Sequence, residues 1–306
     1  MNTYIKHYIS LFLCVFLMLS TASCQNDDDT SVIVAREYAP LTQTLLENTE
    51  LVSKVFKDTT FVVAPGVEET DIHYLSMKGL TMRIFILKAD MARQDVSLEP
   101  LTPYGSTGYA MQTVPDMLKW FDVPGQKAVA AINADFFNMT TGEPRGIVHI
   151  EGEAVRTTPL AGRSFFGTTK NGEIIIAHTD DYPEMQDRLQ DALGGGDLLI
   201  KNHIRTAITN EDVHPRTAVG LTADNVLYFI AIDGRQFDYS NGMTLAEITD
   251  VFEALGAKDA ANLDGGGSTT FVTLHSLADV YHIRNRPSDG EPRPVGNGWA
   301  ITVSEQ

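Results

Sequence analysis

The 306-residue chain is poor in cysteine and in basic residues. Cys14 and Cys24 are its only cysteines, so a network of disulfide bonds cannot be the basis of the fold. Its 23 lysines and arginines are outnumbered by 40 aspartates and glutamates, which gives a formal net charge of -17. A surface this acidic argues against nucleic acid as a partner and against adhesion to anionic lipid.

Several functional signatures are also missing. The glycines at 265–267 are not followed by the Gly-Lys-Ser/Thr of a nucleotide-binding loop. The histidines show no metal-ligand spacing such as His-Glu-x-x-His. The chain has no internal repeat and no low-complexity run. We therefore expect that no cofactor is required, with a divalent cation held by aspartates beside a phosphate as the open alternative.

The first 24 residues are predicted to be a lipoprotein signal peptide. Lys6 precedes an apolar run at 9–19 that is too short to cross a bilayer comfortably. Residues 21–24, Thr-Ala-Ser-Cys, resemble a bacterial lipobox, which implies cleavage before Cys24 and lipidation of that cysteine. We expect anchoring in the cell envelope, in the outer membrane. The alternative is a simple secretory signal with an incidental cysteine.

The remainder divides into a tether and one domain. Residues 25–59 are predicted to form an acidic tether and an N-terminal helix, with a helical pattern over 41–56. Residues 60–306 are predicted to form a single α+β domain, a mixed sheet with many strands and few helices. A second helix is predicted over 184–193, where three glycines would stop it. The runs at 216–221 and 226–232 flank a hairpin turn.

The domain is organised around residues 226–270. Two apolar runs each end on Asp-Gly, at Asp233 and at Asp264. Between them, 244–256 carries a capping box and apolar residues at helical spacing, closed by glycine. A strand–helix–strand crossover makes the two strands parallel, so both aspartates would lie at the same edge of a sheet, where ligands bind. The alternative is that each Asp-Gly is only a tight turn.

Ordered motifs around this unit resemble the phosphodiester glycosidase family. The likeness extends from about residue 127 to the C-terminus. The matching segments are 131–137, 214–220, 233–235, 242–247, 262–270 and 285–287. One departure is Ala134-Asp135, where the family often has glycine, and this leaves the role of Asp135 open.

The resemblance implies hydrolysis of a sugar-1-phosphodiester, of the N-acetylglucosamine-1-phosphate type or from a related cell-surface or host glycan. Asp233 and Asp264 are the candidate carboxylates at the anomeric centre, and Arg216 and Arg235 are candidates for holding the phosphate. Carboxylates ~5 Å apart would favour a retaining route, and ~6.5–9.5 Å an inverting one. Which aspartate acts as base, nucleophile or stabiliser stays open.

Further candidates for binding the substrate come from the same motifs. The backbone N–H groups of the glycine run are expected to form a nest for the phosphate. These substrate-binding candidates are Asn133, Asp135, His214, Asn262, Gly265, Gly266, Gly267, Ser268, Asn285 and Arg286.

Two other functions fit the sequence. The first is a metal-assisted phosphodiesterase that cuts the P–O bond instead of the glycosidic bond. The second is a surface glycan-binding lipoprotein without turnover, which the lipid anchor and tether suit equally well. Binding modules usually display aromatic platforms, and with aromatics at 8% the sequence shows no obvious cluster.

Overall fold

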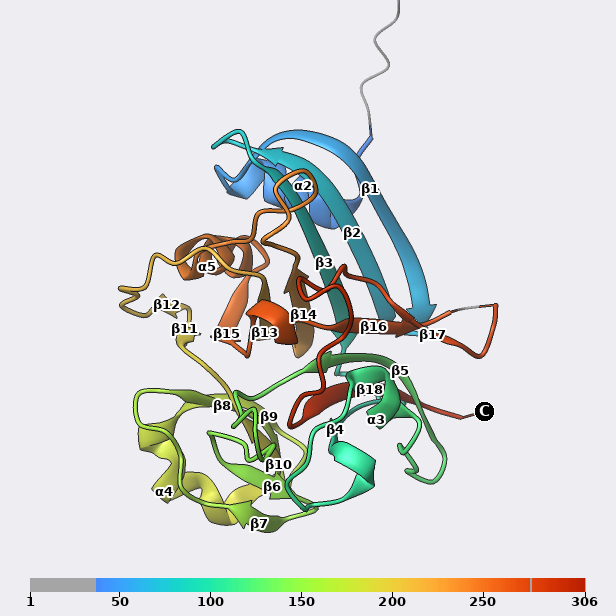
Figure 1. The fold of residues 1–306 in the computed structure, drawn as a ribbon, viewed down its shortest axis with the longest axis vertical. Helices are drawn as coiled ribbons and strands as arrows, with labels where there is room; N and C mark the ends of the chain where they lie inside the picture. Colours follow the sequence, from blue (N-terminus) through green and yellow to red (C-terminus); the bar gives the residue numbers. More distant parts are fainter. Residues whose placement is uncertain (1–36, 276, 306) are drawn as a thin grey trace, which may run out of the picture. The chain divides into compact units, whose positions relative to one another are not determined.

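The computed structural model describes residues 37–275 and 277–305. The predicted signal peptide, Cys24 and the tether as far as residue 36 lie outside the described residues. The chain from Tyr38 onward is one compact unit. It has many strands and few helices, which confirms the predicted class (Figure 1). None of the described helices has the length and apolar character needed to cross a membrane.

The elements follow one another along the chain with short connections. The helices are α2 (Pro40–Asn48), α3 (Val114–Leu118), α4 (Tyr182–Met185) and α5 (Leu245–Ala254), and the 3-10 turns are η1 (Pro103–Gly105), η2 (Thr179–Asp181), η3 (Gln186–Arg188) and η4 (Gly266–Ser268). The strands are β1 (Val52–Ala64), β2 (Val67–Ser76), β3 (Thr81–Asp90), β4 (Val96–Leu101), β5 (Gln126–Asn133), β6 (Val148–Ile150), β7 (Glu153–Arg156), β8 (Ser164–Thr169), β9 (Ile174–His178), β10 (Leu189–Gly194), β11 (Leu198–Lys201), β12 (Ile204–Arg205), β13 (Arg216–Thr222), β14 (Val226–Ile232), β15 (Ala257–Asn262), β16 (Phe271–Leu274), β17 (Tyr281–Ile283) and β18 (Gly298–Ser304).

The strands form three sheets rather than one. The largest has the order β1-β2-β3-β14-β13-β15-β11-β12, and the two five-stranded sheets have the orders β7-β6-β10-β8-β9 and β17-β16-β5-β18-β4. Neighbouring strands in the described chain are antiparallel, so the sheets are not mixed. The many hairpins explain this, because a short turn can join only antiparallel strands.

The predicted strand–helix–strand unit is present, with one strand inserted. β13 pairs antiparallel with both β14 and β15, so β14 and β15 run parallel on its two sides. The capping box between Thr244 and Glu247 begins α5 as expected. Arg216 lies opposite Ile232, and Ala218 opposite Asn262. The carboxyl ends of β14 and β15 therefore meet the start of β13 at one edge of the sheet.

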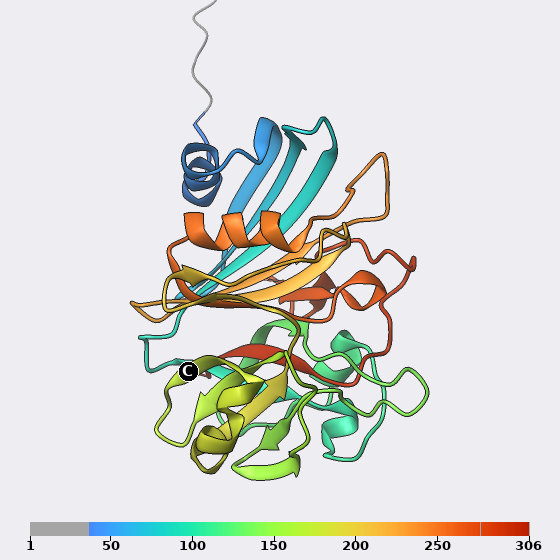
Figure 2. The same cartoon turned by 90° about the vertical axis from the view of Figure 1, so that its left-hand side faces the viewer.

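Each face of the large sheet is covered by a different layer. One face packs against α2 and α5 through a cluster that includes Ile84, Ile230 and Phe252 (Figure 2). The opposite face packs against the two smaller sheets, with Phe166 between Phe229 and Trp299 at ring-centroid distances of 6.4 and 5.0 Å. Large apolar side chains buried on both faces fix the register of the central strands, since a one-residue slip would turn them over.

Two predicted helices are wrong in extent or in kind. The first, over 41–56, is α2 alone: it ends at Asn48, and β1 begins at Val52 and continues across residue 60. The second, over 184–193, is mostly strand, because β10 pairs with β6 and β8. A short apolar run does not by itself distinguish a buried strand from a buried helix. Gly194 does not stop a helix; its backbone packs against Gly146.

Candidate active site

The site is built where β13, β14, β15 and β5 come together. Asn133, the last residue of β5, ties these elements to one another. Its Oδ1 accepts hydrogen bonds from Thr217 Oγ1 (2.9 Å) and Thr270 N (3.0 Å). Its Nδ2 donates to the main-chain oxygen of Asp264 (2.6 Å). The structure thus brings Asn133 to the site, as predicted, but it engages this side chain in holding the loop after β15.

Asp264 lies half-buried at the centre of this arrangement. Its N–H donates to Ala134 O (2.8 Å), which fixes the backbone beside the end of β5. Burial raises the pKa of its carboxyl to about 6, against a hydrogen bond with the Ser268 side chain and the positive charge of Arg293, which both lower it. A partly buried carboxylate with cations nearby can contact a ligand and change protonation near neutral pH.

The carboxylate that acts electrostatically on Asp264 belongs to Asp135. Asp135 is 2% exposed, and its Oδ2 accepts a hydrogen bond from Gly146 N (2.7 Å). A Cβ at Gly194 would lie 2.6 Å from this oxygen, so glycine is needed there. Burial is the main cause that raises the pKa of Asp135 to about 7, and the charge of Asp264 contributes to this rise. Oδ1 of Asp135 has no hydrogen-bond partner among the described residues.

Asp233 has a different environment. It is 1% exposed, and its Oδ1 and Oδ2 accept hydrogen bonds from Asn285 Nδ2 (3.1 Å) and Arg286 N (2.8 Å). Burial raises its pKa to about 6. Because β13 lies between β14 and β15, the main chains at Asp233 and Asp264 are about 10 Å apart, two strand spacings. Asp233 holds the 285–286 loop through both of its carboxylate oxygens, and its pairing with Asp264 at the anomeric centre stays a prediction.

That loop is fixed on both sides of Asn285. Asn285 Oδ1 accepts from Phe271 N (2.8 Å), and its Nδ2 also donates to Thr269 O (3.0 Å). One residue earlier, Arg284 Nε donates to the buried carboxylate of Glu69 (2.7 and 3.0 Å). The Asn285 side chain therefore forms its hydrogen bonds within the protein. They position Arg286, whose guanidinium lies over the ring of Tyr239 at 5.2 Å.

A cationic cluster lies on the glycine run. Nη2 of Arg235 is 3.3 Å from His214 Nδ1, and a Cβ at Gly266 would lie 3.2 Å from the same nitrogen. Arg235 is exposed and has a left-handed backbone with φ +60°. Burial and then the charges of Arg216 and Arg235 lower the pKa of His214. An exposed guanidinium in a strained backbone conformation beside other cations is a typical anion-binding arrangement.

The glycines serve close packing rather than the predicted nest. The N–H of Gly266 donates to Pro215 O (2.9 Å) and that of Ser268 to Gly265 O (3.1 Å). A Cβ at Gly265 would lie 2.5 Å from Pro215 O. The run therefore presses against the strand that carries His214 and lets Arg235 lie over Gly266. At least two of its N–H groups are used within the protein.

Arg216 is less accessible than predicted. Its side chain is buried, and Nε donates to Met243 O (2.9 Å) while Nη2 donates to Asp212 O. Burial lowers the pKa of this guanidinium. Arg216 thus holds two main-chain segments together and adds positive charge beneath Arg235. Asn262 is also buried; its Nδ2 donates to Leu263 O (2.8 Å), and its Oδ1 has no partner in the described chain.

Two residues at the site lie outside the sequence motifs. Arg293 donates to Asp289 Oδ2 (2.6 and 2.9 Å) and to Ser268 Oγ (3.4 Å). The only sequence signal for it is the carboxylate four residues earlier. Asn297 Oδ1 accepts from Asp135 N (2.9 Å), and no isolated asparagine would be singled out from a sequence. Across residues 37–275 and 277–305, no group of three or more His, Cys, Asp or Glu is placed to hold a metal ion.

The fold and the site together define a class: a β-rich protein with a carboxyl pair beside a cationic surface, suited to an anionic ligand. Residues 126–302, more than half of the chain, match the family model described as phosphodiester glycosidase. The chain belongs to this family.

Curated relatives are similar over part of their length. The N-acetylglucosamine-1-phosphodiester alpha-N-acetylglucosaminidase of Mus musculus is 29% identical over 211 residues, which is 62% of this chain and 39% of the mouse protein. The prophage-derived uncharacterized protein YomE of Bacillus subtilis is 28% identical over 291 residues, covering 85% of this chain and 41% of its own length. The chain thus spans about two fifths of the length of these relatives.

Solved structures support the fold. The zebrafish catalytic domain of the same enzyme, auto-inhibited by its pro-peptide, superposes with a TM-score of 0.61 at 20% identity, covering 81% of this chain and 88% of that one. A hypothetical protein from Synechocystis superposes with a TM-score of 0.63 at 15% identity, covering 81% of this chain and 64% of the other. At these identities the likeness is one of fold.

Proposed function

We propose that this chain hydrolyses the glycosidic bond of a sugar-1-phosphodiester, with N-acetylglucosamine-1-phosphate diesters as the first substrates to test. The observation that carries the proposal is the position of Arg235 over Gly266, two residues after Asp264. An anion bound by this guanidinium lies beside the Asp264 carboxylate. Membership of the phosphodiester glycosidase family supports the same chemistry.

The residues take separate roles in this proposal. The charges of Arg235 and of the buried Arg216 attract the single negative charge of a phosphodiester, and the planar guanidinium of Arg235 holds two of its oxygens. His214, whose pKa is lowered, is the neutral neighbour of Arg235 Nη2 at 3.3 Å. Phosphate is a good leaving group, so the bond to the anomeric carbon needs little acid assistance. The main task is to stabilise positive charge that develops on the sugar, and a nearby carboxylate does this.

Asp264 is the carboxylate proposed to act at the anomeric carbon. Asp135 is its buried neighbour: the charge of Asp264 helps to raise the pKa of Asp135 to about 7, and burial raises that of Asp264 to about 6. Near neutral pH, such a pair holds one proton more readily than none. With that proton on Asp135, Asp264 is ionised and acts either as nucleophile or as the base that activates water. The configuration of the released sugar distinguishes these two routes.

Hydrolysis in isotope-labelled water tests which bond breaks. The full chain is incubated with a panel of sugar-1-phosphodiesters, and both products are analysed by mass spectrometry. Label in the sugar supports the proposed glycosidic cleavage. Label in the phosphate would instead establish a P–O phosphodiesterase, and loss of that activity with EDTA would assign a divalent cation to it. Binding without product would leave a glycan-binding protein.

We also propose that Cys24 carries a lipid that anchors the protein in the outer membrane. The support is its lipobox-like context, 21–24, after a short apolar run. Metabolic labelling with an alkyne fatty acid should mark the wild-type protein and not Cys24→Ser, and the variant should leave the membrane fraction. A labelled or membrane-bound Cys24→Ser would contradict the proposal.

A further inference from the structure

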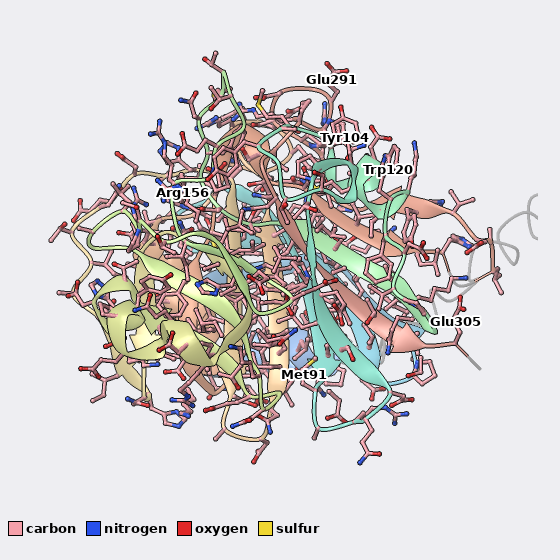
Figure 3. The ribbon with its side chains drawn as sticks, turned by 90° about the horizontal axis from the view of Figure 1, so that it is seen from below. Met91, Tyr104, Trp120, Arg156, Glu291 and Glu305 are labelled. Carbon is pink, nitrogen blue, oxygen red and sulfur yellow. The ribbon has the colours of Figure 1, made fainter. Side chains whose placement is uncertain are left out.

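Two aromatic side chains stand exposed next to each other in the segment between β4 and β5. Trp120 is 55% exposed and Tyr104 52%, and their rings meet edge to face, with centroids 6.0 Å apart and an interplanar angle of 77°. Figure 3 shows them side by side at the surface. Large aromatic rings are normally among the most buried surfaces of a domain, so a paired exposure points to a ligand.

The backbone holds Tyr104 in this exposed position. Tyr104 has a left-handed backbone with φ 59°, and its N–H donates to Gln112 Oε1 (2.8 Å). Gly105 follows with φ 62°, and a Cβ there would contact the main-chain oxygen of Trp120 at 3.4 Å. A non-glycine residue in this conformation is maintained only where its surroundings enforce it. The aromatic pair is therefore a built feature of the loop after β4.

A hollow of about 240 Å³ lies beside Trp120, the member of the pair that lines it, and Gly105, the residue after Tyr104. Trp120 and the neighbouring Phe121 form part of its wall, and the carboxylates of Glu99, Glu151 and Asp191 form another part. An aromatic face beside several hydrogen-bond acceptors suits a sugar ring, whose C–H face stacks on the aromatic ring while its hydroxyl groups donate to the carboxylates. Because Asp122 also lines the hollow, four acidic side chains surround it, and it favours a neutral sugar over an acidic one.

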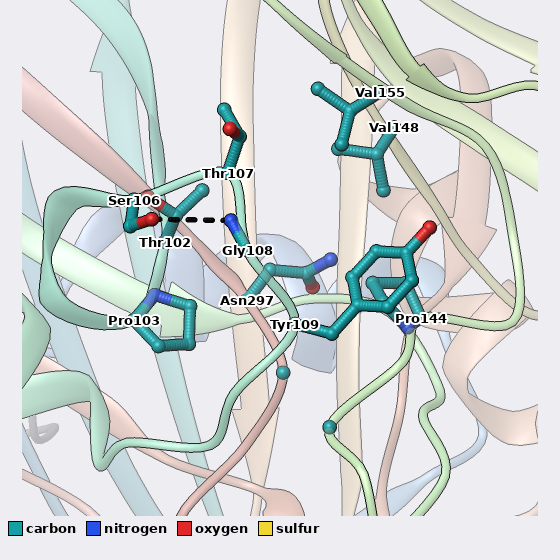
Figure 4. Close-up of a pocket in the computed structure, with 12 residues that line it drawn as sticks. Thr102, Pro103, Ser106, Thr107, Gly108, Tyr109, Pro144, Val148, Val155 and Asn297 are labelled. Atoms are coloured by element: carbon teal, nitrogen blue, oxygen red, sulfur yellow. Dashed lines mark hydrogen bonds between the residues drawn. The ribbon is translucent and has the colours of Figure 1, made fainter.

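Hydrogen bonds and a short stretch of chain connect the pair to Asp135. Gln112, which holds Tyr104, forms two main-chain hydrogen bonds with Val295 (3.1 and 2.9 Å). Two residues further, Asn297 accepts the hydrogen bond from Asp135 N and lines a small hollow beneath Tyr109 (Figure 4). Nδ2 of Asn297 is buried without a partner among the described residues. One unsatisfied donor, Nδ2 of Asn297, thus lies on the connection from the aromatic pair to Asp135.

We propose that Tyr104 and Trp120 form a platform that stacks on a neutral sugar ring of a longer glycan whose phosphodiester lies at Asp264. This inference rests on the proposed function and narrows its substrate class from single sugar phosphodiesters to oligosaccharides. The second ring is bound by stacking and by hydroxyl contacts, so it adds affinity without taking part in bond cleavage.

The two tryptophans of the chain make this proposal measurable. Trp120 is exposed and Trp299 is 0% exposed, so a sugar at the platform changes the emission of Trp120 alone. The full chain carrying Asp264→Asn is titrated with neutral tetrasaccharides of N-acetylglucosamine, mannose and glucose. We expect a saturable change with at least one of them, and weaker binding of a galacturonic acid tetramer.

Variants locate the binding. Tyr104→Ala keeps the Trp120 reporter and should weaken binding of the tetrasaccharide about 10-fold, the loss expected for one stacked aromatic. Phe56→Ala is the matched control, because Phe56 is also an exposed aromatic in an edge-to-face pair, with His73 on the distant β1–β2 hairpin. It should bind like the parent. No saturable change with any neutral tetrasaccharide, or equal binding by the Tyr104 variant, overturns the platform.

A kinetic measurement separates this inference from the proposed function. In the otherwise wild-type chain, Trp120→Ala should raise KM for an oligosaccharide phosphodiester about 10-fold and leave kcat/KM for a small methyl phosphodiester unchanged. Equal losses on both substrates would contradict the platform while leaving the hydrolase intact. Fluorescence binding by a chain that hydrolyses neither substrate would overturn the proposed function and support the platform.

Discussion

The two Asp-Gly turns end parallel strands at the same edge of one sheet, yet their carboxylates differ. Asp233 is enclosed, with both oxygens hydrogen-bonded to the 285–286 loop. Asp264 is half-buried, with Ser268 and Arg293 on one side and Asp135 on the other. The local sequence is the same, so the difference comes from what the fold packs opposite each turn. A loop faces Asp233, whereas the end of β5 faces Asp264.

The two environments suit different roles, one in holding the fold together and one in reacting with substrate. A buried carboxylate whose oxygens are already satisfied by N–H donors gains little from a ligand and loses much when changed. A partly exposed carboxylate next to cations and a second acid keeps a face for substrate. We therefore assign a structural role to Asp233 and a chemical role to Asp264.

Asp264→Asn should lower kcat by about 1000-fold or more, because the amide cannot act as nucleophile or base and does not stabilise positive charge. The measurement is turnover of a sugar-1-phosphodiester by the full chain. The change is isosteric and half-exposed, so the thermal midpoint should move little. A variant within tenfold of the wild-type kcat would remove Asp264 from the chemistry.

Arg235→Ala should lower kcat/KM by about 100-fold, the loss of a charge-assisted, two-point contact with phosphate. Arg235→Lys should recover part of this loss, because lysine keeps the positive charge but cannot donate two parallel hydrogen bonds as the planar guanidinium does. Arg188→Ala is the matched control: Arg188 is an exposed arginine paired with Glu173, away from the site, and its removal should leave kcat/KM unchanged. Equal kcat/KM for the Arg235 and Arg188 variants would contradict the proposed phosphate contact.

Asp135→Asn should change how stability depends on pH. The folded-state pKa of Asp135 is raised to about 7, above its ordinary value, so the native state binds more protons than the unfolded state between these values. The contribution of Asp135 to the free energy of unfolding is fully present at low pH and is lost as the pH rises through about 7. The thermal midpoint of the wild type should therefore decrease as the pH is raised from about 5 to about 8, and the thermal midpoint of the variant should decrease less.

The same variant should also flatten the alkaline limb of the pH–rate profile, since it removes one of two coupled protons. Asp191→Asn serves as a control. Asp191 is another buried carboxyl with a raised pKa, but its Oδ1 accepts from Glu151 N, away from Asp264. It should affect stability in the same direction and leave the pH–rate profile in place. Identical pH–rate profiles for wild type and Asp135→Asn would separate Asp135 from the reacting pair.

Asp233→Asn should cost stability more than turnover. The amide presents one acceptor where two N–H donors now bind, so one donor loses its partner and unfolding becomes easier by about 1–3 kcal/mol. Chemical denaturation measures this loss. We expect kcat to fall less than tenfold, through looser positioning of Arg286. A large loss of kcat in a variant of wild-type stability would reverse the roles of the two aspartates.

Much of this arrangement could be predicted from the sequence. Apolar runs closed by Asp-Gly, and the capping box at Thr244, identify strands and helix because their signals are local. The shared sheet edge follows from the crossover. The insertion of β13 between β14 and β15 could not be read from local pattern, because it depends on which strands pair. The choice between Asp233 and Asp135 as the neighbour of Asp264 follows from that pairing.

The helix predicted over 184–193 fails for a related reason. Gly194 and Gly146 approach each other with the Asp135 carboxylate beside them, so these glycines are needed by a long-range contact. In the sequence alone, a glycine run after an apolar segment indicates the end of a helix just as well as it indicates a close contact between distant main chains. The sequence does not indicate the exposed aromatic pair, because Tyr104 lies before α3 and Trp120 after it, and only the fold of this segment makes them neighbours.

The central claim is that Asp264, and not Asp233, acts on the substrate. Measuring kcat/KM for Asp264→Asn and Asp233→Asn side by side, on the same phosphodiester and at a temperature where both remain folded, tests it most directly. We predict a loss of about 1000-fold or more for Asp264→Asn and of less than about tenfold for Asp233→Asn. The opposite order, or equal losses, would contradict the account.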